Sequence, residues 1–484
     1  MLTERLQTLE REARLLEPSA AERARAREAV INYTEVFLGE IEHRKAFDES
    51  SVPNSAWSAL EIDGKTIGID AAVKTIEDLV DGPALNPASG GHLGYIPGGG
   101  IYYSSLGDYL AAITNRYAGI LFASPGAVRM EHSLVDWMAS LVGYPRGAAG
   151  NLTSGGSIAN LSGIVSARDA GGIKARDFHR AVIYTTEHAH HCLDKAYRIA
   201  GVGEAVRRNV PMDDRYRMDA AALEKAIEDD HRAGLLPWLI VAAAGTTDVG
   251  AIDPLEKIGD IAKRHKLWFH IDAAYGGFFL LTDEGKKKLK GIEKSDSVVM
   301  DPHKGLFLPY GLGAILVRER KHLRASHQYQ AAYMQDAKAA DDSPADLSPE
   351  LTKHFRGLRL WLPLKLHGIA PFKACLEEKL LLARYVHEQL RQMSGFEVLN
   401  EPELSVVAFR YVPREGDANE KNRKIQAMVQ ADGRVFISST TIQGRVVLRI
   451  AILCFRTHLS TVQIALQVLQ DSVRRLEQQS GRQL

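Results

Sequence analysis

The sequence is poor in cysteine, with three in 484 residues, and it has no long uninterrupted apolar segment. Cys192, Cys375 and Cys454 lie far apart and fit no metal-ligand spacing, so neither a disulfide framework nor a structural metal site is expected. Isolated cysteines of this kind are typical of a cytoplasmic protein. The longest apolar stretches, such as 238–244, have the length of a strand, whereas a membrane span needs about 18–20 apolar residues. We therefore expect no membrane segment.

An excess of charge is also absent, because 60 Lys and Arg residues balance 60 Asp and Glu residues. Without a basic surplus the chain lacks the electrostatic character that nucleic acids and anionic membranes attract, so neither is an expected partner. Residues 1–27 are crowded with Glu and Arg and lack the apolar core of a signal peptide. The composition, 45% hydrophobic and 25% charged, is that of an ordinary globular protein.

Apolar spacing predicts an α/β protein. Residues 1–40 show helical periodicity, and a loop rich in Gly and Pro follows at 81–100. Farther along, helical patterns such as 188–200 and 254–266 separate short apolar runs, which are expected to be strands at 181–185, 238–244, 267–272, 297–301 and 313–317. This alternation predicts a largely parallel sheet with helices on both faces and ligands at the carboxyl ends of its strands.

The remaining sequence suggests a division into three parts. Residues 336–350 are polar and aperiodic and predict a long mobile loop, followed by an amphipathic helix at 352–368. The last hundred or so residues have a helix–strand–helix pattern. We expect an N-terminal helical segment, a large α/β domain and a small C-terminal α+β domain, with limits at 1–85, 86–365 and 366–484.

Lys304 ends the segment Asp301-Pro-His-Lys, directly after the expected strand 297–301. At the ligand edge of a sheet it would be partly desolvated, which lowers the pKa of a lysine. The neutral amine is the form that attacks an aldehyde to give a Schiff base. Taken alone, the tetrapeptide is equally compatible with a surface lysine after a turn.

Asp272 ends the strand 267–272 and is followed by Ala273, Ala274 and Tyr275. A carboxylate there can pair with a protonated pyridine nitrogen and keep that ring a strong electron sink. The small side chain of Ala274 would let a flat ring lie against the backbone. The alternative is an aspartate that caps a turn or a helix.

Two further segments fit an aromatic phosphate ligand. The run from Thr153 to Ser157, TSGGS, precedes a helical pattern and would present backbone N–H groups to a phosphate at the positive end of that helix. His190, after the strand 181–185, could stack on an aromatic ring. Thr246 and Thr247 follow the strand 238–244 as candidate donors to the ligand, or as simple turn residues.

The histidines around position 190 also permit a metal hypothesis, through His188, His190, His191 and Cys192. On the expected helix, however, residues 188 and 190 point apart, and no second Cys/His cluster completes a four-ligand set. A metal is therefore not expected.

In their order and spacing these segments resemble the group II pyridoxal-phosphate-dependent amino acid decarboxylases, over about residues 91–456. The segments that carry the resemblance are 153–161, 185–201, 245–247, 270–277, 301–304, 354–361 and 448–451. The resemblance implies the fold-type-I aminotransferase architecture, with a smaller C-terminal α+β domain. It also implies a homodimer with active sites at the interface, across which the N-terminal helices are exchanged.

The resemblance also implies the roles of individual residues toward pyridoxal 5′-phosphate. Lys304 would be the Schiff-base lysine, Asp272 the partner of the pyridinium nitrogen, and His190 the stacking residue poised for proton transfer. The other matching positions are Gly156, Ser157 and His303 at the phosphate, Ala274 under the ring, Thr246 near the phenolic oxygen, and the substrate loop with His92, Tyr95, Ile96 and Pro97. The implied reaction is decarboxylation of an L-amino acid, aromatic or bulky, to an amine and CO2.

Three departures from the family pattern leave alternatives open. Asp301 stands where many relatives have Asn, and a carboxylate there would repel phosphate unless it points away. Residues 341–346, DDSPAD, lack the tyrosine that the family's mobile loop usually carries as proton donor, so Tyr329, Tyr333 or His190 would have to serve. The substrate loop is also less aromatic than in aromatic decarboxylases.

The sequence therefore leaves two other reactions and a non-catalytic role open. A missing proton donor could divert the reaction toward oxidative deamination, which would yield an aldehyde. A carbon–carbon lyase would need a basic cluster near the pocket loop, and none is evident. For a decarboxylase that acts on an amino acid with a side-chain carboxylate, Arg116 and Arg129 are the candidates to bind that carboxylate. A cofactor-binding protein without activity is the alternative from another functional class.

Overall fold

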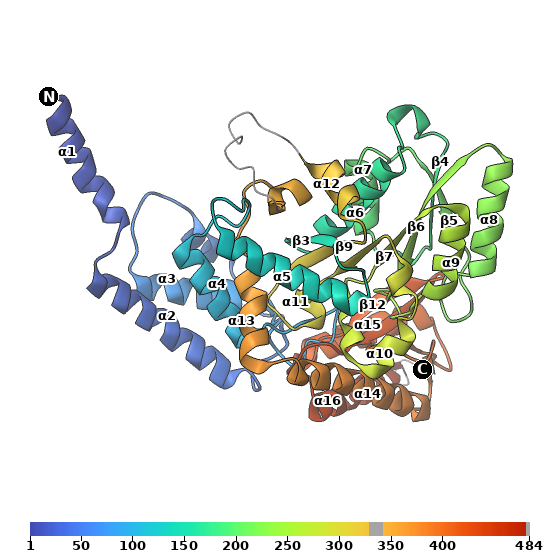
Figure 1. Cartoon of the computed structure of the whole chain (residues 1–484). Coiled ribbons are helices and arrows are strands. Elements are labelled where there is room, and N and C mark those ends of the chain that lie inside the picture. The colour runs from blue at the N-terminus through green and yellow to red at the C-terminus, as the bar shows by residue number, and fades with distance from the viewer. Residues whose placement is uncertain (329–341, 481–484) are drawn as a thin grey trace.

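The computed structural model describes residues 1–328 and 342–480, and its framework is a seven-stranded sheet (Figure 1). The strand order is β3-β9-β8-β7-β6-β4-β5. The strands are β3 (Ala149–Thr153), β4 (Ala181–Thr185), β5 (Val206–Asn209), β6 (Leu236–Ala243), β7 (Trp268–Asp272), β8 (Ser297–Met300) and β9 (Gly313–Val317). Only β9 runs antiparallel to its neighbours in this sheet, so the predicted largely parallel sheet is confirmed.

Helices cover both faces of the sheet, as the apolar strands require. Along β4 and β6, Ile183, Leu239 and Val241 pack against α6 (Gly156–Ala170) and α7 (Cys192–Ile199). The alternate residues Val182 and Ile240 face the other core, which is completed by α5 (Pro125–Val142), α8 (Ala220–Arg232) and α9 (Leu255–His265). Side chains alternate between the two faces of a strand, so each strand contributes to both cores.

The C-terminal part contains a four-stranded antiparallel sheet in the order β10-β11-β13-β12. Its strands are β10 (Phe396–Val398), β11 (Val406–Tyr411), β12 (Ser438–Ile442) and β13 (Arg445–Ala451). They share a second apolar core with α14 (Ala370–Gln392), α15 (Ala418–Asp432) and α16 (Leu459–Ser480). The limits of the three predicted parts stay predictions.

The N-terminal helices extend away from the two sheets (Figure 1). The predicted helix 1–40 is interrupted near Pro18, and it forms α1 (Leu2–Ala13) and α2 (Ala20–Glu40), the latter capped by Ser19 and Glu22. Neither helix has a buried residue. The remaining elements are α3 (Ile69–Ile76), α4 (Tyr102–Thr114), α10 (Asp283–Lys288), α11 (Pro302–Gly305), α12 (Arg320–His327), α13 (Gly357–His367) and the pair β1 (Phe47–Asp48) and β2 (Ala84–Leu85).

Two predicted helices begin later than their patterns indicated. The helix expected at 188–200 begins at Cys192, because the ring of His190 accepts the backbone N–H of Cys192 and residues 188–191 form a turn. The helix expected at 352–368 begins at Gly357. Residues 329–341, which include Tyr329, Tyr333 and part of the predicted mobile loop, lie outside the described residues. Within the described ranges, no helix is long and apolar enough to cross a membrane.

Candidate active site

A cavity of about 360 Å³ opens at the carboxyl ends of the parallel strands. Its walls come from the start of α6, the turn before α7, and the segments that follow β6, β7 and β8. Its lining includes all eight predicted cofactor residues, namely Gly156, Ser157, His190, Thr246, Asp272, Ala274, His303 and Lys304. The fold thus brings together residues that are up to 148 positions apart in the sequence (304 − 156).

Lys304 lies on the short helix α11 and pairs with a buried carboxylate. Its Nζ lies 3.0 Å from Asp301 Oδ2, and Asp301 is almost completely buried. Burial alone would lower the pKa of Lys304, but the negative charges of Asp301 and Asp272 outweigh this effect and raise it. The prediction that desolvation lowers the pKa of Lys304 is therefore wrong, because the two carboxylates favour its charged form.

The Asp301 carboxylate lies directly behind the start of α6. A Cβ atom placed on Gly156 would come within 2.8 Å of Asp301 Oδ2, so the close approach requires glycine at this position. Asp301 Oδ1 has no hydrogen-bond partner among the described residues. The carboxylate thus lies close to the start of α6, and the Lys304 ammonium balances its charge.

His303 lies next to Asp301 with one ring nitrogen already bonded. Its Nδ1 donates to the carbonyl oxygen of Leu312 at 2.5 Å, and its Nε2 is 3.8 Å from Asp301 Oδ2. Burial lowers the pKa of His303 below its ordinary value. A neutral ring whose Nδ1 carries the proton leaves Nε2 as an acceptor, so His303 would donate to a phosphate only when Nε2 is protonated as well.

Asp272 is held by two donors at the end of β7. Its Oδ1 accepts the backbone N–H of Ala274 at 3.1 Å, which is the turn-capping contact considered as an alternative. Its Oδ2 accepts from Asn160 Nδ2 at 3.2 Å. Asn160 lies on α6 and was not recognised from the sequence. Because the carboxylate lines the cavity as well, capping and ligand binding are compatible roles.

His190 lies in the turn before α7, half-buried at the cavity wall. Its Nδ1 accepts the backbone N–H of Cys192 at 3.2 Å, and burial lowers the pKa of the ring. The neutral ring therefore carries its proton on Nε2. His188 lines the same cavity and stacks on Tyr216, with ring centres 5.6 Å apart.

The turn that carries Thr246 is tied to distant parts of the chain. The hydroxyl of Thr246 accepts the N–H of Ala251 at 3.1 Å. The buried guanidinium of Arg449, on β13, donates to the carbonyl oxygens of Thr247 and Asp248 and to Ser438 Oγ. All three of these acceptors belong to the protein itself, so Arg449 has a structural role here.

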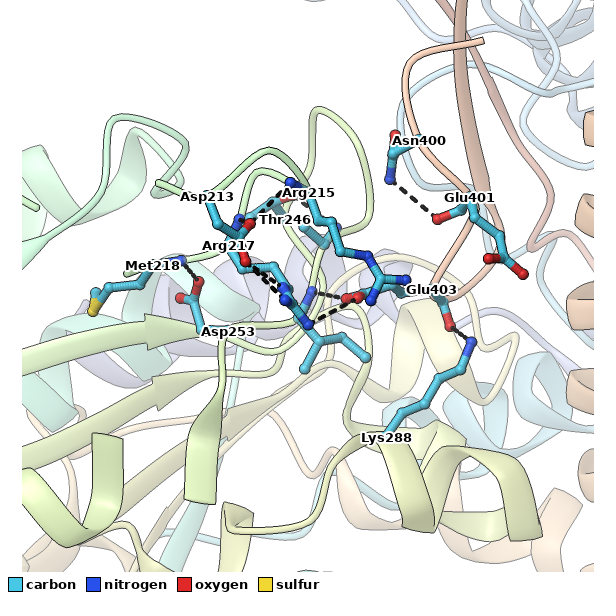
Figure 2. Close-up of polar contacts among 12 residues, drawn as sticks. Asp213, Arg215, Arg217, Met218, Thr246, Asp253, Lys288, Asn400, Glu401 and Glu403 are labelled. Atoms are coloured by element: carbon cyan, nitrogen blue, oxygen red, sulfur yellow. Dashed lines mark hydrogen bonds and ion pairs between the residues drawn. The ribbon is translucent and has the colours of Figure 1, made fainter. Parts of the chain in front are cut away.

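A network of hydrogen bonds and ion pairs supports the segments that flank the Thr246 turn (Figure 2). The buried carboxylate of Asp253 accepts the N–H groups of Met218 and Ala243, each at 2.7 Å. The carboxylate of Glu403 accepts the N–H of Ile252 at 2.6 Å and lies 3.8 Å from Arg217. The cavity wall at Thr246 is therefore built from both the large sheet and the C-terminal part.

The predicted substrate loop does not line this cavity in the single chain. His92, Ile96 and Pro97 are buried within the protein, whereas 59% of the Tyr95 surface is exposed. The loop does run past the cavity floor, because a Cβ atom on Gly98 would lie 2.1 Å from the carbonyl oxygen of His303. The substrate role of these four residues stays a prediction.

The donor set of the cavity fits pyridoxal phosphate. It combines the N–H groups at the start of a 15-residue helix, an amine on Lys304, a carboxylate on Asp272 and the imidazole of His190. A phosphate, an aldehyde, a ring nitrogen and a ring face each find a chemically suitable partner among these groups.

Known proteins share both the sequence and the fold of this chain. Residues 92–412 match the model of the pyridoxal-dependent decarboxylase conserved domain. An aromatic-L-amino-acid decarboxylase from Bacillus atrophaeus is 31% identical over 78% of this chain and 79% of its own length. A phenylacetaldehyde synthase from Arabidopsis thaliana is 28% identical over 78% of this chain and 80% of its own. The crystal structure of Oryza sativa TDC with PLP and tryptamine superposes with a TM-score of 0.89 at 25% identity, covering 95% of this chain and 99% of that one.

Proposed function

The chain belongs to the family of pyridoxal-dependent decarboxylases, and we propose that its substrate is an L-amino acid with an uncharged, aromatic or bulky side chain. The reaction is pyridoxal-phosphate-dependent decarboxylation to an amine and CO2. The observation that carries the proposal is the convergence of Lys304, Asp272 and His190 on one cavity.

The residues of the cavity would hold the cofactor by groups of matching chemistry. Lys304 would attach it covalently, and Asp272 would pair with its ring nitrogen. His190 would stack on one face of the ring, and Ala274 would lie on the other. Gly156, Ser157 and His303 would bind the phosphate, and Thr246 would reach the phenolic oxygen.

The bound cofactor supplies a cationic ring that accepts the electron pair left when the bond between Cα and the carboxylate breaks. The protein's part is to keep that ring protonated through Asp272 and to return a proton to Cα. His190 is suited to the second task, because its Nδ1 is taken by the Cys192 N–H and its proton resides on Nε2. The described part of the loop, residues 342–350, contains no tyrosine that could compete for this role.

The side-chain preference is inferred from the charges of the cavity. Lys304 is the only lysine among its lining residues in the described chain, and no arginine lines it. Arg116 and Arg129 do not line the cavity within one chain. A substrate with an uncharged side chain is the one that this lining matches, and the name of the Bacillus relative agrees with it.

Oxidative deamination to an aldehyde is the second candidate. It is favoured by the absence of a tyrosine in DDSPAD and by the similarity to a phenylacetaldehyde synthase. This route consumes O2 and releases ammonia and hydrogen peroxide in proportion to CO2. Those two products therefore distinguish it from simple decarboxylation.

We further propose that the protein is a cytoplasmic homodimer. Leu2, Leu6 and Leu9 on α1 are 74%, 57% and 50% exposed, and a 12-residue helix without packing is marginal in water. A second copy of the chain would cover these side chains. Tyr95, the exposed member of the substrate loop, would contribute to the substrate pocket of the assembled enzyme. The three cysteines are unpaired, which suits a reducing compartment.

The test is to offer the cofactor-loaded enzyme, in air, each of the common L-amino acids and to identify the products by mass spectrometry. The proposal predicts an amine from one or more aromatic or bulky substrates, without peroxide. Amine formation only from acidic or basic amino acids would contradict the substrate class. An aldehyde with stoichiometric ammonia and peroxide would establish the second candidate instead.

A further inference from the structure

A series of four hydrogen bonds links Trp268 to the Asp272 carboxylate along one face of the sheet. Trp268 Nε1 lies 2.9 Å from Ser297 Oγ, which lies 2.7 Å from His270 Nδ1. His270 Nε2 lies 2.8 Å from Asn160 Oδ1, and Asn160 Nδ2 lies 3.2 Å from Asp272 Oδ2. Trp268, His270 and Asp272 alternate along β7, so their side chains share the sheet face on which α6 places Asn160.

The direction of every bond in this series follows from its two ends and from the neutral imidazole of His270. An indole N–H can only donate, and an ionised carboxylate can only accept. The hydroxyl of Ser297 therefore accepts from Trp268 and donates to His270 Nδ1. The proton of His270 resides on Nε2 and is donated to Asn160 Oδ1, which leaves the amide group of Asn160 to donate to Asp272. The donors all point the same way, toward the carboxylate.

This series of hydrogen-bonded side chains is buried in the protein and closely packed. Asn160, His270 and Ser297 are buried. A Cβ atom on Gly163 would lie 2.6 Å from His270 Cε1, so α6 approaches the imidazole through a glycine. Burial lowers the pKa of His270 to about 4, which keeps its ring neutral under physiological conditions. Asn160 Nδ2 also contacts Cys192 Sγ, at 3.5 Å.

We propose that Asn160 and His270 are positioning residues that hold the carboxylate of Asp272 aimed at the ring nitrogen of the cofactor. The inference rests on the proposed role of Asp272 and extends it to residues that do not touch the ligand. A donor to Oδ2 favours the charged carboxylate over the protonated one. The charged carboxylate in turn keeps the proton on the ring nitrogen, which the decarboxylation requires.

The test uses holoenzyme loaded with pyridoxal phosphate that carries ¹⁵N at its ring nitrogen. In the wild type, the ¹⁵N chemical shift reports a protonated ring throughout the accessible pH range. In Asn160→Ala, we expect the ring to lose its proton within that range, and the Kd of the cofactor to rise roughly tenfold. The matched control is Asn422→Ala, because Asn422 is an equally buried asparagine that bonds to the backbone of Tyr411 and Ala418 instead. It should lower thermal stability without moving the ¹⁵N signal.

An Asn160→Ala holoenzyme with a wild-type ¹⁵N shift at every pH would overturn the proposal. If this variant does not fold or load, Ser297→Ala carries the test, because it removes the donor to His270 while Asn160 stays. It should move the pH dependence of the ring in the same direction by a smaller amount, and an unchanged profile would overturn the proposal. The variant Asp272→Asn distinguishes the role of Asp272 from the positioning role of Asn160 and His270. A wild-type ¹⁵N signal in Asp272→Asn would refute the role of Asp272 itself. A shifted signal there with a wild-type signal in Asn160→Ala would refute only the positioning role.

Discussion

Asp301 and Lys304, three positions apart after β8, form an ion pair with Oδ2 and Nζ 3.0 Å apart. The pair joins the residue that would attach the cofactor to a carboxylate that lies against the start of α6, where the phosphate would bind. One carboxylate would therefore have two effects on cofactor binding. It stabilises the ammonium form of Lys304, and it places a negative charge next to the phosphate.

Asp301→Asn should bind pyridoxal phosphate more tightly than the wild type. The substitution keeps the shape of the side chain and removes a buried negative charge beside the phosphate position. We expect the Kd to fall roughly tenfold, as measured by absorbance titration of the cofactor-free protein. Asp260→Asn, at a surface carboxylate paired with Lys294, is the control and should leave the Kd unchanged. Weaker binding by Asp301→Asn would contradict this electrostatic account.

The rate of cofactor attachment should rise with pH. The pKa of Lys304 is raised, and only the neutral amine can attack an aldehyde. Below that pKa the neutral fraction increases about tenfold for each pH unit, so the rate should follow the same slope. Stopped-flow absorbance of the cofactor would measure it. In Asp301→Asn the profile should move to lower pH, whereas a rate independent of pH in both proteins would show that deprotonation of Lys304 is not limiting.

Asp253 should make stability depend on pH in the direction opposite to a surface carboxylate. Burial raises the pKa of Asp253 to about 6, although the N–H groups of Ala243 and Met218 donate to it. Between its ordinary pKa and the raised one, the folded chain binds more protons than the unfolded chain. The contribution of Asp253 is thus fully present below the ordinary value and is lost as the pH rises through about 6.

Denaturant unfolding of the wild type and Asp253→Asn at several pH values would isolate this contribution. The stability advantage of the wild type should shrink by roughly 3 kcal/mol between about pH 4 and pH 7. The same change should loosen the turn that carries Thr246, because Asp253 accepts the N–H of Ala243 at the end of β6, just before that turn. An advantage that grows with pH would mean that Asp253 is stabilised in its charged form.

The exposed leucines of α1 should hold two copies of the chain together. Leu6→Lys combined with Leu9→Lys places charges on this apolar stripe, and sedimentation equilibrium should then show a shift from dimer toward monomer. Leu381→Lys, at an exposed leucine on α14 outside the N-terminal helices, is the matched control and should leave the assembly intact. A wild-type mass for the double variant would place the interface elsewhere.

The sequence predicted the strands that are rich in apolar side chains and missed those that are not. The runs at 181–185 and 313–317 became β4 and β9 with the expected limits. β3, with the sequence AGNLT, and β5, with VRRN, carry too few apolar residues for their pattern to indicate a strand. The antiparallel direction of β9 also could not be predicted, because a buried apolar run is compatible with either direction.

The residues predicted to bind the cofactor line one cavity, but their contacts with one another were not predicted. Asp272 and Lys304 follow apolar strands, a local signal that a sequence displays directly. The ammonium state of Lys304 depends on where Asp301 points, and the support of Asp272 depends on α6 lying across β7. Both are contacts between side chains that only the folded chain brings together, and residue spacing does not encode them.

The central claim is that Lys304 is the residue to which the cofactor is attached. Borohydride reduction of the cofactor-loaded enzyme, followed by proteolysis and mass spectrometry, would fix the cofactor on the lysine that bears it. The account predicts one modified peptide, with the label on Lys304, and no label in Lys304→Ala. A label on another lysine, or equal labelling of Lys304→Ala, would contradict it.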